Sequence, residues 1–76
     1  MMHHNIPVTL QIGKQGLTAS VLAEIQKQLK TRKIIKIRLL KSALEDLDRK
    51  KFAEELAEKS NAYLVHQVGF IVVLKK

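Results

Sequence analysis

The first forty residues place a helix-like segment between two strand-like segments, and this order restricts the fold more than any other feature. Apolar and polar residues alternate over 7–12, which is typical of a strand with one buried face. Apolar residues at helical spacing then predict a helix over 18–31, and alternation returns over 34–40. A strand–helix–strand unit pairs its two strands in parallel through a right-handed crossover. The start of the chain therefore predicts a parallel strand pair covered by a helix.

The alternation also predicts which side chains of the two strands face the core. The residues expected inside are Val8, Leu10 and Ile12 from the first strand and Ile35, Ile37 and Leu39 from the second. Lys36 and Arg38 fall on the other face of the second strand. Since two basic residues are poorly suited to burial, we expect that face to meet either solvent or a ligand.

The segment 41–47 is ambiguous. Ser42 and Glu45 have the spacing of a capping box, which would start a second helix early. The leucines of this segment are out of phase with the helical pattern that follows it, so we favour a start at Asp46 or Asp48.

The last third of the chain predicts the end of that helix and a hairpin. The helical pattern ends near Ser60, and two β-branched segments, 63–68 and 70–74, follow with Gly69 between them. The full order is β-α-β-α-β-β, an α/β (α+β) class with a mixed four-stranded sheet and helices packed on it. The expected organisation is a flexible N-terminus over 1–6 and one domain over 7–76.

Positive charge is concentrated in the first half of the chain. The formal net charge is +7, and the segment 14–41 alone has eight basic residues and one acid, Glu24. A one-sided positive field attracts polyanions, although charge alone leaves RNA, DNA and a merely solvating role open. No apolar run approaches the ~20 residues of a membrane span, and the first residues lack a signal-peptide pattern. We expect a cytoplasmic protein with no membrane partner, and the oligomeric state stays open.

Residues suited to catalysis or metal binding are few. The chain has no cysteine, which excludes disulfides and cysteine-ligated zinc. His3 and His4 have no third ligand nearby in the sequence, and His66 has no identifiable nucleophile or carboxylate partner. The acids at 45–48 are explained by the start of a helix. We therefore expect a protein that is not an enzyme and has no cofactor and no metal.

The loop Gly13-Lys14-Gln15-Gly16 is the strongest functional feature. Glycine permits positive φ and close approach of a ligand, and the helix after it, capped by Thr18, offers unpaired N–H groups to an anion. KH domains clamp about four nucleotides of backbone with such a GxxG loop. The Gly-Lys-Ser/Thr ending of a P-loop is absent. The third glycine and the downstream acid of a dinucleotide-binding fingerprint are absent too. By itself, the pattern fits a purely structural turn equally well.

Three blocks frame this loop in order: 7–18 (PVTLQIGKQGLT), 34–38 (IIKIR), and 53–59 (AEELAEK) leading into 64–69 (LVHQVG). Together they resemble the CRM domain, the chloroplast RNA splicing and ribosome maturation family, whose bacterial member is YhbY. The resemblance extends over nearly the whole chain from residue 7.

The resemblance implies an RNA-binding module with a fold like the C-terminal domain of translation initiation factor three. It also implies RNA contact at the GxxG loop and, for stand-alone prokaryotic members, a link to precursors of the large ribosomal subunit. The chain departs from the family pattern in three places. The six residues before Pro7 cannot supply the usual N-terminal helix, Phe70 replaces a basic residue after the hairpin glycine, and Lys75-Lys76 replaces a Tyr-Arg ending.

We therefore predict a protein that binds ribosomal RNA in large-subunit assembly and contacts the backbone more than the bases. Aromatic residues make up 4% of the chain, whereas RRM and OB-type binders need aromatic platforms. We expect Phe52 in the core, and Tyr63 and Phe70 packed in the hairpin. The predicted RNA contacts are Gly13, Lys14, Gln15, Gly16, Thr18, Lys27, Lys30, Lys36 and Arg38. A protein–protein adaptor of a ribonucleoprotein complex and a basic DNA-binding protein are the alternatives.

Overall fold

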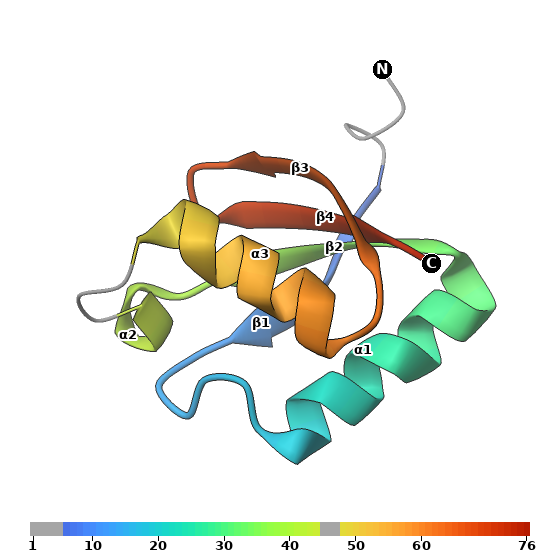
Figure 1. Ribbon diagram of the computed structural model, residues 1–76, viewed down its shortest axis with the longest axis horizontal. Coiled ribbons are helices and arrows are strands. Elements are labelled where there is room, and N and C mark those ends of the chain that lie inside the picture. The colour runs from blue at the N-terminus through green and yellow to red at the C-terminus, as the bar shows by residue number, and fades with distance from the viewer. Residues whose placement is uncertain (1–5, 45–47) are drawn as a thin grey trace.

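A four-stranded sheet with helices on one face forms the molecule (Figure 1). The structure is a computed structural model, described here for residues 6–44 and 48–76. In chain order its elements are β1 (Val8–Ile12), α1 (Ala19–Arg32), β2 (Ile34–Leu39), α2 (Lys41–Leu44), α3 (Arg49–Lys59), β3 (Tyr63–Val68) and β4 (Ile71–Lys75). The predicted order of strands and long helices is confirmed, and the short helix α2 is an addition.

The strand order is β1-β2-β4-β3. β1 and β2 are parallel, while β4 is antiparallel to both of its neighbours. β2 and β3 therefore run the same way with β4 between them, so the chain makes two crossovers in the same direction across the sheet. Crossovers of one hand and one direction place both helices on one face, as Figure 1 shows for α1 and α3. The opposite face of the sheet has no helix among the described residues, and we call it the helix-free face.

The core lies between the sheet and the two long helices. Ile25 and Leu29 of α1 and Phe52 and Leu56 of α3 are buried there, as expected for Phe52. They pack on inward residues of three strands: Ile12, Ile35, Ile37, Leu39, Val72 and Leu74. Each large apolar side chain contributes about 1.5–3 kcal/mol when fully buried. This interface fixes the position of the N-terminal end of α1 and of the loop before it.

The expectation that Val8 faces the core is wrong. Val8 pairs with Lys36 and Leu10 with Ile37, so β1 has one residue, Thr9, more than its partner strand between these pairs. Such a bulge reverses the facing of the residues before it. Val8 is 39% exposed. Thr9 is instead held by Gln28 of α1, whose side-chain amide donates to the Thr9 carbonyl over 3.3 Å.

The ambiguous segment forms a helix of its own before α3. Leu40 leaves the predicted second strand and accepts a bond from the Ala43 N–H, which closes the turn of α2. Leu44 belongs to this short helix and is buried. Because α2 is a separate helix, Leu44 is out of phase with α3. The Asp48 carboxylate accepts from the Lys50 N–H as the N-cap of α3. The later start at Asp48 is thus confirmed, and residues 45–47 lie outside the described residues.

The aromatic residues of the hairpin have different environments. Phe70 is half-buried against the core, and the Arg49 guanidinium lies 4.9 Å from its ring centroid. Tyr63 is 72% exposed, so the expectation that it packs in the hairpin is wrong. Its neighbour across the strands is Lys75, whose own neighbour is Ile34. This row lies on the helix-free face, where no helix covers the ring.

Candidate nucleic-acid interface

The glycine loop is a tight turn that presents two polar side chains. The Gly16 N–H donates to the Gly13 carbonyl over 2.9 Å, and the Thr18 N–H donates to the Gly16 carbonyl over 3.1 Å. Lys14 and Gln15 occupy the two central positions of the turn, and both are exposed. The backbone bonds hold the turn without using either side chain, so the ammonium and the amide are available to a ligand.

The N-terminus of α1 begins directly after this turn. The Thr18 hydroxyl accepts from the Val21 N–H over 3.1 Å, and its carbonyl accepts from the Leu22 N–H. Within the described residues, no acceptor bonds the N–H groups of Ala19 and Ser20. The first turn has no acidic residue, so nothing on the helix neutralises its positive end. Unpaired N–H groups at such an end form an anion-binding site.

The two glycines differ in their structural requirements. Gly16 has φ +69°, a conformation that other L residues rarely adopt. Gly13 does not have positive φ. A Cβ at Gly13 would lie 3.4 Å from the Leu40 side chain, while a Cβ at Gly16 would meet nothing within 4 Å. The turn thus needs glycine at position 16 because of the positive φ there. At position 13 the backbone accepts other residues, and only the nearby Leu40 side chain limits the size of a side chain.

Lys27 and Lys30 extend the positive charge along α1. Both are exposed, and Lys30 lies about 17 Å along the helix axis from Ala19 at 1.5 Å per residue. The acid of this segment, Glu24, accepts from Gln28 over 3.1 Å. Within the described residues, neither lysine is in an ion pair. The positive charge of these two lysines is therefore not neutralised by an ion pair within the described residues, and the track from the loop onto α1 stays a prediction.

Lys36 and Arg38 lie elsewhere, on the helix-free face. They alternate along β2 with residues of the core, and Arg38 pairs with Gln11, two residues before the loop. Arg38 is therefore at the loop end of the sheet, and Lys36 is further from it. The predicted contact residues form two branches that meet at the loop, one along α1 and one across the sheet, with the edge strand β1 between them.

A family model for the CRS1/YhbY (CRM) domain matches residues 1–76. The chain belongs to this family. The resemblance that was read from the three blocks of sequence is confirmed over the whole chain.

Relatives of this CRM domain include one archaeal protein, one bacterial protein and one protein of solved structure. The chain is 39% identical to the Probable RNA-binding protein MJ0652 of Methanocaldococcus jannaschii, over 95% of this chain and 52% of that protein, so it spans about half the length of that relative. It is 34% identical to the Probable RNA-binding protein YqeI of Bacillus subtilis, over 97% and 74%. The solution structure of the hypothetical protein SAV1595 from Staphylococcus aureus matches with a TM-score of 0.78 at 32% identity, over 99% and 76%.

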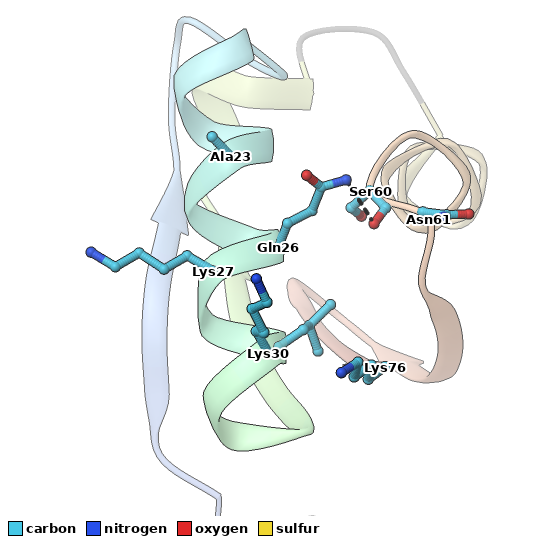
Figure 2. A pocket seen from close by; sticks show the side chains of 8 residues that line it. Ala23, Gln26, Lys27, Lys30, Ser60, Asn61 and Lys76 are labelled. Carbon is cyan, nitrogen blue, oxygen red and sulfur yellow. Dashed lines mark hydrogen bonds between the residues drawn. The ribbon is translucent and has the colours of Figure 1, made fainter.

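The CRM domain has a groove that the sequence did not suggest. It lies between α1 and the C-terminal end of α3, and Figure 2 shows residues of α1 on one side and Ser60 and Asn61, which follow α3, on the other, with Lys76 near them. The Gln26 amide donates to the Ser60 carbonyl across the gap over 3.4 Å. Lys30 and Asn61 are thirty-one positions apart in the chain, so only the packing of α3 beside α1 brings them together.

Two further expectations from the sequence concern a membrane span and a metal site. Among the residues that the structure describes, no helix is long and apolar enough to cross a membrane. In the same ranges, no three His, Cys, Asp or Glu side chains are grouped so that they could hold a metal ion. His3 and His4, for which we expect no metal role, lie outside the described residues, as do Glu45 and Asp46.

Proposed function

We propose that this CRM domain binds RNA and that the turn over 13–16 is the centre of the contact. The observation that carries the proposal is the placement of Lys14 and Gln15 beside the unpaired N–H groups of Ala19 and Ser20. All four groups are donors, and no acidic residue stands in the first turn of α1. The names of the relatives, which describe RNA-binding proteins, support the same ligand class.

In this proposal the loop grips the sugar-phosphate backbone. The Lys14 ammonium pairs with a phosphate oxygen, and the Gln15 amide donates to the same or the next phosphate. The N–H groups at the start of α1 donate to a further anionic oxygen, which the positive end of the helix dipole also attracts. The domain acts as a binding module and not as an enzyme. Affinity from such contacts depends strongly on salt and only modestly on sequence.

A salt series tests the role of the loop. The affinity of the full chain for a fragment of large-subunit ribosomal RNA is measured by fluorescence anisotropy at several KCl concentrations. Lys14→Glu weakens binding and flattens the salt dependence, because one phosphate contact becomes a repulsion. Lys51→Glu is the matched control, since Lys51 is an exposed lysine on α3. Equal effects of the two changes, or an affinity for RNA that does not vary with salt, would overturn the loop as the centre of contact.

The proposed RNA is ribosomal RNA in precursors of the large subunit. The resemblance to stand-alone prokaryotic CRM proteins supports this choice. Crosslinking in cells, followed by sequencing of the bound RNA, is the test. We expect reads from large-subunit ribosomal RNA and its precursors, and reads spread evenly over messenger RNA would contradict the assignment. Competition between duplex DNA and RNA at fixed salt separates this proposal from general DNA binding, because DNA should compete poorly.

One observation favours a second function, that of a protein–protein adaptor. The helix-free face has three exposed apolar side chains: Val8, Tyr63 (72% exposed) and Val68 (58% exposed). These side chains lie on the two edge strands, β1 and β3, of a face that no helix covers in the described residues, where a partner protein could contact them. Light scattering after nuclease treatment tests the idea. A complex that survives the nuclease and is lost in Tyr63→Lys would establish the adaptor function, whereas a monomer at all concentrations would exclude self-association.

A further inference from the structure

The α1–α3 groove, whose lining includes Ala23, Gln26, Leu29, Lys30, Asn61 and Lys76, is a hollow of about 430 Å³. That volume is within the range of small-ligand sites, about 300–1,000 Å³. The groove is open on the side that Figure 2 shows, and the Lys30 side chain rises in it between the two helices. The Lys27 ammonium points to the other side of α1, toward β1. Lys30 is thus the lysine of α1 whose charge belongs to the groove.

The backbone of its far wall is fixed by the end of α3. Asn61 has φ +59°; its N–H donates to the Glu58 carbonyl, and the Ala62 N–H donates to the Ala57 carbonyl. This is a Schellman ending with asparagine in the left-handed position. Because these bonds use the last carbonyls of α3, the negative end of the helix is partly satisfied. The Asn61 side-chain amide has no hydrogen bond within the described residues.

The chemistry of the groove suits a ligand with an apolar face and a negative charge. Ala23 and the buried Leu29 supply apolar surface, and the Asn61 amide supplies a donor and an acceptor. Lys30 and Lys76 supply positive charge, and neither is in an ion pair within the described residues. Among the described residues, no acidic side chain lines the groove. A carboxylate-rich peptide would pair with the two lysines. It would not use the apolar surface of the groove, nor the ability of the Asn61 amide both to donate and to accept a hydrogen bond.

We propose that the α1–α3 groove binds one unpaired nucleotide of the RNA strand that the loop holds. The inference rests on the proposed RNA binding and adds to it a preference for single-stranded segments. The strand runs from the loop along α1, which is about 17 Å to Lys30. There its phosphate pairs with the Lys30 and Lys76 ammonium groups. Its base lies against the exposed Ala23 and the accessible edge of Leu29, with one edge toward the Asn61 amide.

Two groove variants separate the base contact from the phosphate contact. Ala23→Leu fills the groove without changing charge or helix propensity much, and Lys30→Gln removes one positive charge. The control is Lys51→Gln, an identical charge change on α3 at the opposite end of that helix from Ser60. The probes are oligo(U) and the same strand annealed to oligo(A), with affinity measured over a salt series. Thermal unfolding confirms that each variant is folded.

The expected results differ for each variant. Ala23→Leu weakens binding of oligo(U) about five-fold or more, leaves the salt dependence unchanged, and leaves duplex binding within two-fold. Lys30→Gln lowers the slope of log K against log salt by about 0.7 for oligo(U). Lys51→Gln changes neither the affinity for oligo(U) nor the slope of its salt dependence by a comparable amount.

The inference is overturned if Ala23→Leu weakens oligo(U) and the duplex equally, or if neither groove variant differs from the control. Lys14→Glu separates this failure from failure of the function itself. If Lys14→Glu weakens binding while the groove variants have no effect, the loop proposal stands and the groove proposal falls. If the unchanged chain binds neither probe, both proposals fall. Tighter binding of an acidic peptide than of oligo(U) in the groove would likewise overturn the nucleotide assignment.

Discussion

The Gly16 N–H donates to the Gly13 carbonyl over 2.9 Å, and this bond makes the glycine loop a turn with a defined corner. The chain must pass from the parallel strand β1 to the start of α1 within the segment 13–18. Closing the turn by backbone bonds leaves Lys14 and Gln15 at the corner, directed away from the core. The same turn brings their side chains next to the uncovered N-terminal end of α1. The structural role of the loop and the role that we propose for it in RNA binding therefore depend on different atoms.

Gly16→Ala should destabilise the domain by about 1–2 kcal/mol, because alanine is strained at φ +69°. Gly13→Ala should change the unfolding free energy much less, since φ is not positive there and its Cβ meets only the flexible Leu40 side chain at 3.4 Å. Urea denaturation of both variants measures the difference. Gly16→Asn is a useful control, because asparagine tolerates this conformation and should recover part of the loss. Equal destabilisation by the two alanines would contradict the geometry of the turn.

Thr18→Ala should destabilise the domain by about 1 kcal/mol through loss of the N-cap of α1. The hydroxyl that accepts from Val21 is removed, and a further N–H at the start of the helix becomes unpaired. Thr18→Ser keeps an oxygen in this position and should cost only a small part of that amount. The unfolding free energies of the two variants are compared in the same buffer. A serine as damaging as alanine would mean that the methyl group, and not the cap, stabilises this site.

The two basic branches should contribute separately to RNA binding. The double variant Lys27→Gln/Lys30→Gln removes charge from α1, and Lys36→Gln/Arg38→Gln removes it from the helix-free face. Each phosphate contact that is lost lowers the slope of log K against log salt by about 0.9 for a duplex and 0.7 for a single strand. We expect the α1 variant to lower the slope more, because its branch begins at the helix N-terminus. If only the sheet variant changes the slope, RNA lies on the helix-free face instead.

Asn61→Ala should destabilise the domain by roughly 1 kcal/mol, because Asn61 ends α3 in the left-handed region at φ +59°. Asn61→Gly keeps that backbone conformation while it removes the amide, so its unfolding free energy should be close to that of the unchanged chain. Differential scanning calorimetry gives both values. A glycine variant as unstable as the alanine variant would show that the asparagine side chain itself, and not the left-handed backbone, stabilises the end of the helix.

Much of the fold follows from local patterns that the sequence shows directly. Alternation in β2 separates Ile35 and Ile37 from Lys36, and the structure places them on opposite faces. Thr18 and Asp48 are recognisable as caps because their short side chains bond N–H groups a few residues away. The glycine spacing 13–16 marks the turn because Gly16 adopts a positive φ that other residues rarely take. These features depend on neighbours in the chain, so the sequence contains the information that determines them.

Other features depend on contacts between distant residues. The bulge that turns Val8 outward accompanies the bonds between Thr9 and Gln28, and Tyr63 is exposed because both long helices cover the other face of the sheet.

By itself, the sequence determined the family, the order of strands and long helices, and the loop that centres the proposed site. Only the tertiary structure decided that Lys36 and Arg38 lie on a different face from Lys30, and that Lys30 shares a groove with Asn61. The physical reason is that periodicity tells which side of its own element a residue occupies. The direction in which the chain crosses the sheet decides which sides of different elements face one another.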